Sequence, residues 1–138
     1  MNKIRISNIE IRNKLEMEIE ENKAKEYDLE KRTFQFAQST RLLVGKLTRN
    51  ISNIEDCKQV TRSSGSIGAN YIEANEALSK KDFQMRIKIS RKEAKETTYW
   101  LKLLNSDFNK QFEKEIKTLI QESIELMMIF STIMRKTA

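Results

Sequence analysis

Residues 80–104, KKDFQMRIKISRKEAKETTYWLKLL, carry the most regular helical pattern in the chain. Apolar or small residues recur there at alternating spacings of four and three without a break, at Phe83, Ile87, Ser90, Ala94, Thr97, Leu101 and Leu104. This spacing places all seven on one seam of a helix, as in helices that pack together at shallow angles. The segment therefore predicts a helix from about Ser79 to Leu104 within a helical bundle.

Three further segments carry seams of the same kind. One predicted helix runs from about Asp28 to about Asn50, one starts at the Ser52/Asn53 cap, and one follows the turn near residue 108. Their seams are Phe36, Thr40, Leu43, Leu47 and Asn50; Val60, Ser64, Ile67, Tyr71, Ala74 and Leu78; and Phe112, Ile116, Leu119, Ser123, Leu126, Phe130 and Ile133.

These patterns predict an all-α protein, an up-and-down four-helix bundle over residues 27–138. The 138 residues include no proline and three glycines, too few for the many turns of a sheet protein. Loop signals near residues 51 and 106 favour four helices over one long two-helix coiled coil.

Residues 1–26 are predicted to be an N-terminal extension, either a short helix or a flexible segment. They hold six basic and six acidic residues, so the net charge of +6 lies entirely in the rest of the chain. A thin apolar stripe suggests that the extension could become ordered by docking on a partner: Ile11, Leu15 and Ile19. The motif ISNIE at 6–10 and 51–55 has the S-x-x-E spacing of a capping box, which predicts a helix start at both places.

The composition excludes several common kinds of site. Without histidine and with the single cysteine Cys57, one chain cannot assemble a usual zinc site, a Cys–His nucleophile or an intrachain disulfide. An all-carboxylate metal site formed by Glu73, Glu93 and Glu96 is a remote alternative. We expect a protein that is not an enzyme and has no cofactor, although an oligomer cleft could hold a site that one sequence does not reveal.

The cellular setting is expected to be the cytoplasm. The longest apolar run, LMMIF at 126–130, is far too short to cross a bilayer. The N-terminal residues lack the apolar region of a signal peptide, and a single cysteine suits a reducing compartment. We therefore expect no membrane association.

Residues 62–76, RSSGSIGANYIEANE, place two glycines within a predicted helix, where each costs about 1 kcal/mol relative to alanine. With Ile67 in the core, a patch of small residues falls on the opposite side, and the last helix carries a second apolar stripe. We interpret both as a homo-oligomer interface: Gly65, Gly68, Ala69, Ile72, Ile120, Ile124, Met127 and Met134. The alternatives are that inner and outer faces are exchanged, or that the N-terminal segment covers the patch.

Two polar features lie beside these faces. Arg62, Ser66, Asn70 and Glu73 form a polar edge, which we interpret as a network between helices rather than a site. A basic row opposite the seam of residues 80–104 is a candidate nucleic-acid contact: Lys81, Lys88, Arg91, Lys92, Lys95 and Lys102.

The alternative for the basic row is a solvated face with pairs such as Lys92–Glu96. Aromatic residues are not interleaved with the row, which favours contacts to the nucleic-acid backbone over contacts to bases. Tyr99 and Trp100 are interpreted as packing residues in the core or between subunits.

Three stretches resemble the four-helix-bundle protein family that includes the 23S rRNA intervening-sequence proteins. They are EKRTFQFAQ (30–38), QVTRSSGSIGANYIEA (59–74) and residues 80–104. The resemblance covers about residues 27–135 and implies a left-handed bundle that assembles into a ring, a pentamer, without an assigned catalytic activity. Similar bundles are the accessory variability determinant proteins of diversity-generating retroelements, which bind a reverse transcriptase and nucleic acid.

The leading hypothesis is a non-enzymatic, ring-forming bundle that binds nucleic acid, with structured RNA favoured, through basic helix faces. The alternative is a protein-interaction scaffold that docks an acidic or polymerase-type partner, such as a reverse transcriptase, without touching nucleic acid.

Overall fold

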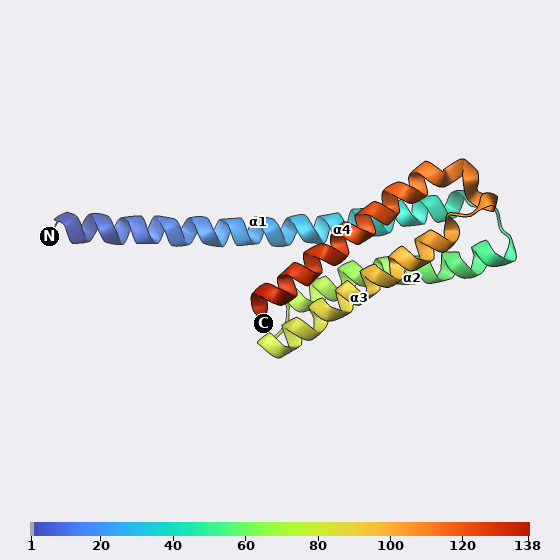
Figure 1. Cartoon of the computed structure of the whole chain (residues 1–138). Coiled ribbons are helices and arrows are strands. Elements are labelled where there is room, and N and C mark those ends of the chain that lie inside the picture. Colours follow the sequence, from blue (N-terminus) through green and yellow to red (C-terminus); the bar gives the residue numbers. More distant parts are fainter. Residues whose placement is uncertain (1) are drawn as a thin grey trace.

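The computed structural model describes the backbone of residues 2–138 and the side chains of 7–21 and 28–138 (Figure 1). Met1, the first residue of the predicted extension, lies outside the described residues. The described chain consists of four α-helices and one 3₁₀ helix, with no strand: α1 (Asn2–Lys46), α2 (Ile51–Asn75), α3 (Lys80–Leu104), η1 (Asp107–Phe112) and α4 (Glu113–Thr137). The all-α prediction is confirmed.

Successive helices run antiparallel and are joined by short connections (Figure 1). Each helix packs against two others, α1 and α3 each lying between α2 and α4. This arrangement is the predicted up-and-down four-helix bundle. It arises because each helix carries one apolar seam, and four seams facing inward bury one another.

The core is built from the predicted seams. In α3, six of the seven seam residues are buried, and Phe83 is partly buried against the core. Leu43, Ile67 and Phe130 are fully buried examples from the other three helices. One exception is Leu78, which is fully exposed because α2 ends at Asn75, three residues before it.

The helix starts correct two predictions. The side chain of Asn50 caps α2 by accepting a hydrogen bond from the backbone N–H of Asn53 at 2.8 Å, so the cap is not Ser52/Asn53. The other S-x-x-E motif, Ser7 to Glu10, lies inside α1 and starts nothing. A capping motif acts only where the preceding backbone leaves the helical region, and here the helix continues through it. Ser79 caps α3, which begins where the sequence predicted.

The extension is the first part of α1 rather than a separate short helix. Helix α1 runs from Asn2 to Lys46 without interruption, so the predicted start near Asp28 is wrong. Its N-terminal part projects from the bundle, and the side chains at 7–21 are all exposed (Figure 1).

Buried polar side chains link the helices across the core. The hydroxyl of Thr97 lies 2.8 Å from that of Ser63, and Ser90 donates to the carbonyl of Ile67 at 2.9 Å, both joining α3 to α2. At the loop end, the amides of Asn53 and Asn109 bond to each other at 2.8 and 2.9 Å. Satisfied pairs of this kind fix the register of helices that apolar contacts alone would let slide.

Candidate nucleic-acid interface and neighbouring grooves

The basic row lies on the face of α3 that points away from its seam. Five of its six members are exposed and Arg91 is half-buried. None of the six side chains forms a hydrogen bond or an ion pair with the described part of the chain. The row is Lys81, Lys88, Arg91, Lys92, Lys95 and Lys102.

The two glutamates of α3 that could neutralise the row are engaged elsewhere. Arg62 on α2 reaches Glu93 and Glu96, each at 3.3 Å. Glu93 is buried and Glu96 partly exposed, both turned toward α2. The pair Lys92–Glu96 suggested by the sequence therefore does not form, and the row keeps its full positive charge.

The polar edge joins α2 to α3 as predicted. Asn70 donates to Ser66 Oγ at 3.0 Å and accepts from Arg86 at 3.2 Å, while Arg62 holds the two glutamates. Glu73 stands exposed and takes no part in this network. Among the described residues, no group of three acidic, cysteine or histidine side chains is placed to hold a metal ion.

Tyr99 lies within the basic row, which the sequence interpretation missed. It is 58% exposed, four positions after Lys95 and three before Lys102. Its ring meets Trp100 edge-on, with centroids 5.0 Å apart and planes at 73°, and Trp100 packs against the core. The expectation that no aromatic residue joins the row is wrong, and Tyr99 does not pack in the core of its own chain. The spacing to the two lysines would have revealed this.

The glycine patch faces α1 of the same chain. A Cβ built on Gly68 would lie 2.8 Å from Thr33 Oγ1, and one on Gly65 would lie 3.1 Å from the Arg41 guanidinium. The glycines therefore allow α1 and α2 to approach closely, and the prediction that they point away from their own bundle is wrong. The wheel of α2 showed a second small face, but it could not tell which helix lies there.

The rest of the predicted oligomer interface is divided between surface and core. Ala69 and Ile72 are exposed on the wall of a groove of about 440 Å³ between α1 and α2. The α4 stripe is partly buried, and three of its members pack against the core: Ile120, Met127 and Met134, with Ile124 half-buried beside them. The α4 stripe therefore offers a partner less apolar surface than its sequence suggests.

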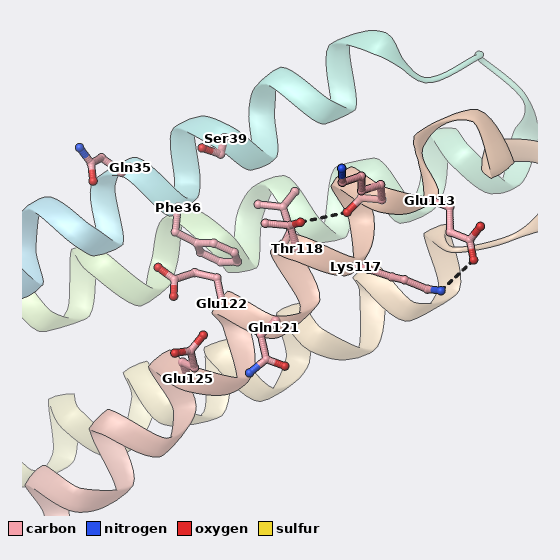
Figure 2. A pocket seen from close by; sticks show the side chains of 11 residues that line it. Gln35, Phe36, Ser39, Glu113, Lys117, Thr118, Gln121, Glu122 and Glu125 are labelled. Atoms are coloured by element: carbon pink, nitrogen blue, oxygen red, sulfur yellow. Dashed lines mark hydrogen bonds and ion pairs between the residues drawn. The ribbon is translucent and has the colours of Figure 1, made fainter.

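A larger groove of about 820 Å³ opens between α1 and α4 (Figure 2). Buried Phe36 lines it, and its acidic side chains have basic neighbours. The Arg32 guanidinium donates two hydrogen bonds to the Glu122 carboxylate, and this interaction raises the pKa of Arg32 despite partial burial. Lys117 lies 2.9 Å from Glu113 and lowers the pKa of that carboxyl. The acidic side chains Glu113 and Glu122 of the groove are thus held in ion pairs.

A second basic surface appears where α1 ends and α2 begins. A groove of about 710 Å³ there is lined by Arg41, Arg49, Lys58 and Arg62, with no carboxylate in its lining. Cys57 also lines it, and burial together with Asp56 raises the pKa of its thiol. The thiol therefore stays protonated at neutral pH and is a poor nucleophile.

None of the helices described is both long and apolar enough to span a bilayer. The model of the family described as 23S rRNA-intervening sequence protein matches residues 25–132. A similar solved structure is that of a protein with unknown function from the S23 ribosomal protein family of Bacteroides thetaiotaomicron. It is 28% identical, covers 80% of this chain and 97% of its own, and superposes with a TM-score of 0.67.

No curated protein sequence matches the chain. The family match leaves out most of the extension but includes the glycine patch, the polar edge and the basic row. The chain belongs to the 23S rRNA-intervening sequence protein family.

Proposed function

We propose that this protein binds nucleic acid, with structured RNA favoured, through the basic row of α3, and that it does so without catalysis. The observation that carries the proposal is the unpaired state of the row. Six cationic side chains share one helix, while Arg62 of the neighbouring helix holds Glu93 and Glu96. Cations without acidic partners are free to replace the counterions of phosphates.

The geometry of the row suits a nucleic-acid backbone. From Lys81 to Lys102 the row extends over roughly 30 Å at 1.5 Å per residue. A rigid helix of this length presents charges at fixed intervals, which favours contacts to phosphates and to the shape of a folded RNA over contacts to base edges.

Self-association would strengthen such binding. The family resemblance implies a ring, a pentamer, and a ring would repeat the row in every subunit and so raise the effective affinity by avidity. Of the predicted interface, Ala69 and Ile72 on the exposed wall of the α1–α2 groove remain available for contact between subunits, and the exposed ring of Phe34 lines the same groove.

The first test reverses the charge of the row. Changing Lys88, Lys92 and Lys95 to glutamate should reduce affinity for a structured rRNA fragment at least about tenfold near 100 mM salt, because each lysine that meets a phosphate releases a counterion. Fluorescence anisotropy over a salt series should also show a shallower dependence of log affinity on log salt, by about one per phosphate-contacting lysine.

A matched control changes three equally exposed lysines outside α3: Lys31, Lys110 and Lys114 to glutamate. The net charge then changes equally, so only the position differs. Equal losses in the two variants would mean generic attraction between a basic protein and a polyanion. No RNA binding by the unaltered protein at low salt would reject the proposal and leave the scaffold that docks an acidic or polymerase-type protein.

A second prediction concerns Tyr99. If an unpaired base stacks on its exposed ring, Tyr99→Ala should weaken binding to a single-stranded RNA loop by about tenfold, since stacking on an aromatic side chain is worth about 1–3 kcal/mol per base. Tyr99→Phe should keep most of the affinity because it keeps the ring. If Tyr99→Ala and Tyr99→Phe weaken binding by the same factor, and do so equally for a duplex and for a single-stranded loop, Tyr99 does not stack on a base.

A further inference from the structure

The apolar stripe of the extension continues the buried seam of α1. Within the bundle, buried residues recur along α1 at spacings of three and four: Leu29, Thr33, Phe36, Thr40, Leu43 and Leu47. The same alternation carried backwards reaches positions 26, 22, 19 and 15, which include Ile19 and Leu15, and Ile11 lies one helical turn before Leu15 on the same side of the helix. In the bundle this face is covered by α2 and α4, whereas in the extension no described helix covers it (Figure 1).

Because its apolar seam is uncovered, the extension gains little packing free energy as an isolated helix. Ile11, Leu15 and Ile19 are 55%, 54% and 53% exposed. The extension spans roughly 40 Å at 1.5 Å per residue, and most of the stability of protein helices comes from packing an apolar face rather than from helix propensity. A partner that covers this seam would therefore stabilise the extension.

The charges of the extension are divided at Leu15. Residues 3–14 carry four basic side chains and one acidic side chain, while residues 16–21 carry four glutamates and no basic residue. Two copies laid parallel and in register would place basic on basic and acidic on acidic. Two copies laid antiparallel place each basic part over the acidic part of the other, which favours that orientation.

We propose that the extension pairs with the extension of a second copy of this chain, as an antiparallel two-helix coiled coil with a two-fold axis near Leu15. The uncovered seam supplies the apolar contact, and the divided charges select the orientation. A two-fold interface uses the same surface on both copies, so this pairing joins two bundles from outside. It does not depend on nucleic-acid binding.

The chain offers a matched control for the seam. Ile9 and Met17 are 54% and 61% exposed, as much as the stripe. Met17 lies on the side of α1 opposite Leu15 and Ile19, and Ile9 lies outside the stripe, two positions from Ile11. The full-length variant Leu15→Gln/Ile19→Gln removes the seam contact, and the full-length variant Ile9→Gln/Met17→Gln removes equally exposed apolar side chains elsewhere. Both variants keep the bundle unchanged, so any association through the bundle contributes equally to their measured masses.

Sedimentation velocity over a concentration series provides the first measurement. The seam variant should show at least about tenfold weaker association than the unaltered chain, because two apolar contacts are lost in each copy. Its circular dichroism at 222 nm should also fall as the extension frays. The control variant should keep the association strength and the circular dichroism of the unaltered chain. Equal average mass for the unaltered chain and the seam variant at every concentration would overturn the proposal.

Charge exchange identifies the partner. Arg12→Glu/Lys14→Glu changes the net charge of residues 3–14 from +3 to −1, and Glu16→Lys/Glu18→Lys changes that of residues 16–21 from −4 to 0. Each variant alone should weaken the pairing because no basic part then faces an acidic part, and an equimolar mixture should regain much of it because the −4 part of one extension then faces the +3 part of the other. No recovery in the mixture would show that the extension contacts some other surface, such as a groove of the bundle, and would reject the pairing.

Discussion

Asn109→Leu is expected to lower the free energy of unfolding by about 3 kcal/mol, since it removes a buried amide and strands its partners. Asn109 donates to the carbonyl of Leu104 at 2.8 Å and exchanges two hydrogen bonds with Asn53. Both asparagines are almost fully buried, at 2% and 3% exposure. The leucine would leave the carbonyl of Leu104 and the side-chain oxygen of Asn53 without their donor. Urea denaturation followed by circular dichroism measures the change.

Asn105→Leu is the matched control. Asn105 lies in the same connection, and its side chain forms no hydrogen bond with the described residues, so this change should stay within about 0.5 kcal/mol. The double variant Asn53→Leu/Asn109→Leu should lose clearly less than the sum of the two single changes, because no amide is left unpaired. Strict additivity would show that the two amides do not interact in solution.

Gly68→Leu is expected to destabilise the bundle by about 3 kcal/mol, because overpacking at a tight helix contact forces the backbones apart. Even the Cβ of alanine would lie 2.8 Å from Thr33 Oγ1 and 3.1 Å from Thr33 Cβ. Gly68→Ala should therefore also destabilise, although alanine favours the helix by about 1 kcal/mol. Thermal and urea unfolding of the purified variants measure both effects.

The other two glycines serve as controls. A Cβ on Gly65 would meet only the tip of the Arg41 side chain, which can move, so Gly65→Ala should be close to neutral. Nothing lies within 4 Å of a Cβ on Gly45, so Gly45→Ala should stabilise by about 0.5 kcal/mol. Equal effects at all three positions would show that the contact between Gly68 and Thr33 is not tight.

The Gly68 contact also changes how subunit assembly should be tested. A bulky residue at Gly68 disturbs the chain's own fold before it reaches any second copy. Ala69 and Ile72 are exposed on the wall of the α1–α2 groove, so charged residues there would test assembly without opening the bundle.

Local sequence determined the helices and their buried faces. The alternation of four and three in residues 80–104 predicted the seam of α3 and the buried positions along it, and the same pattern gave most of the core in the other helices. Periodicity is a property of a single helix, so it can be read without knowing the neighbours. The solvent-facing position of the basic row follows from the same property.

Tertiary structure decided what each remaining face meets. In the folded chain the glycines of α2 lie against Thr33 and Arg41. Glu93 and Glu96 form ion pairs with Arg62 of α2 and not with the lysines of their own helix. Helix α1 also continues without interruption past the Ser7–Glu10 motif, which therefore starts no helix. These contacts depend on which helix lies beside each face and on the axial register between neighbouring helices. The packing of all four helices sets the neighbours and the register, so neither can be read from a single helix.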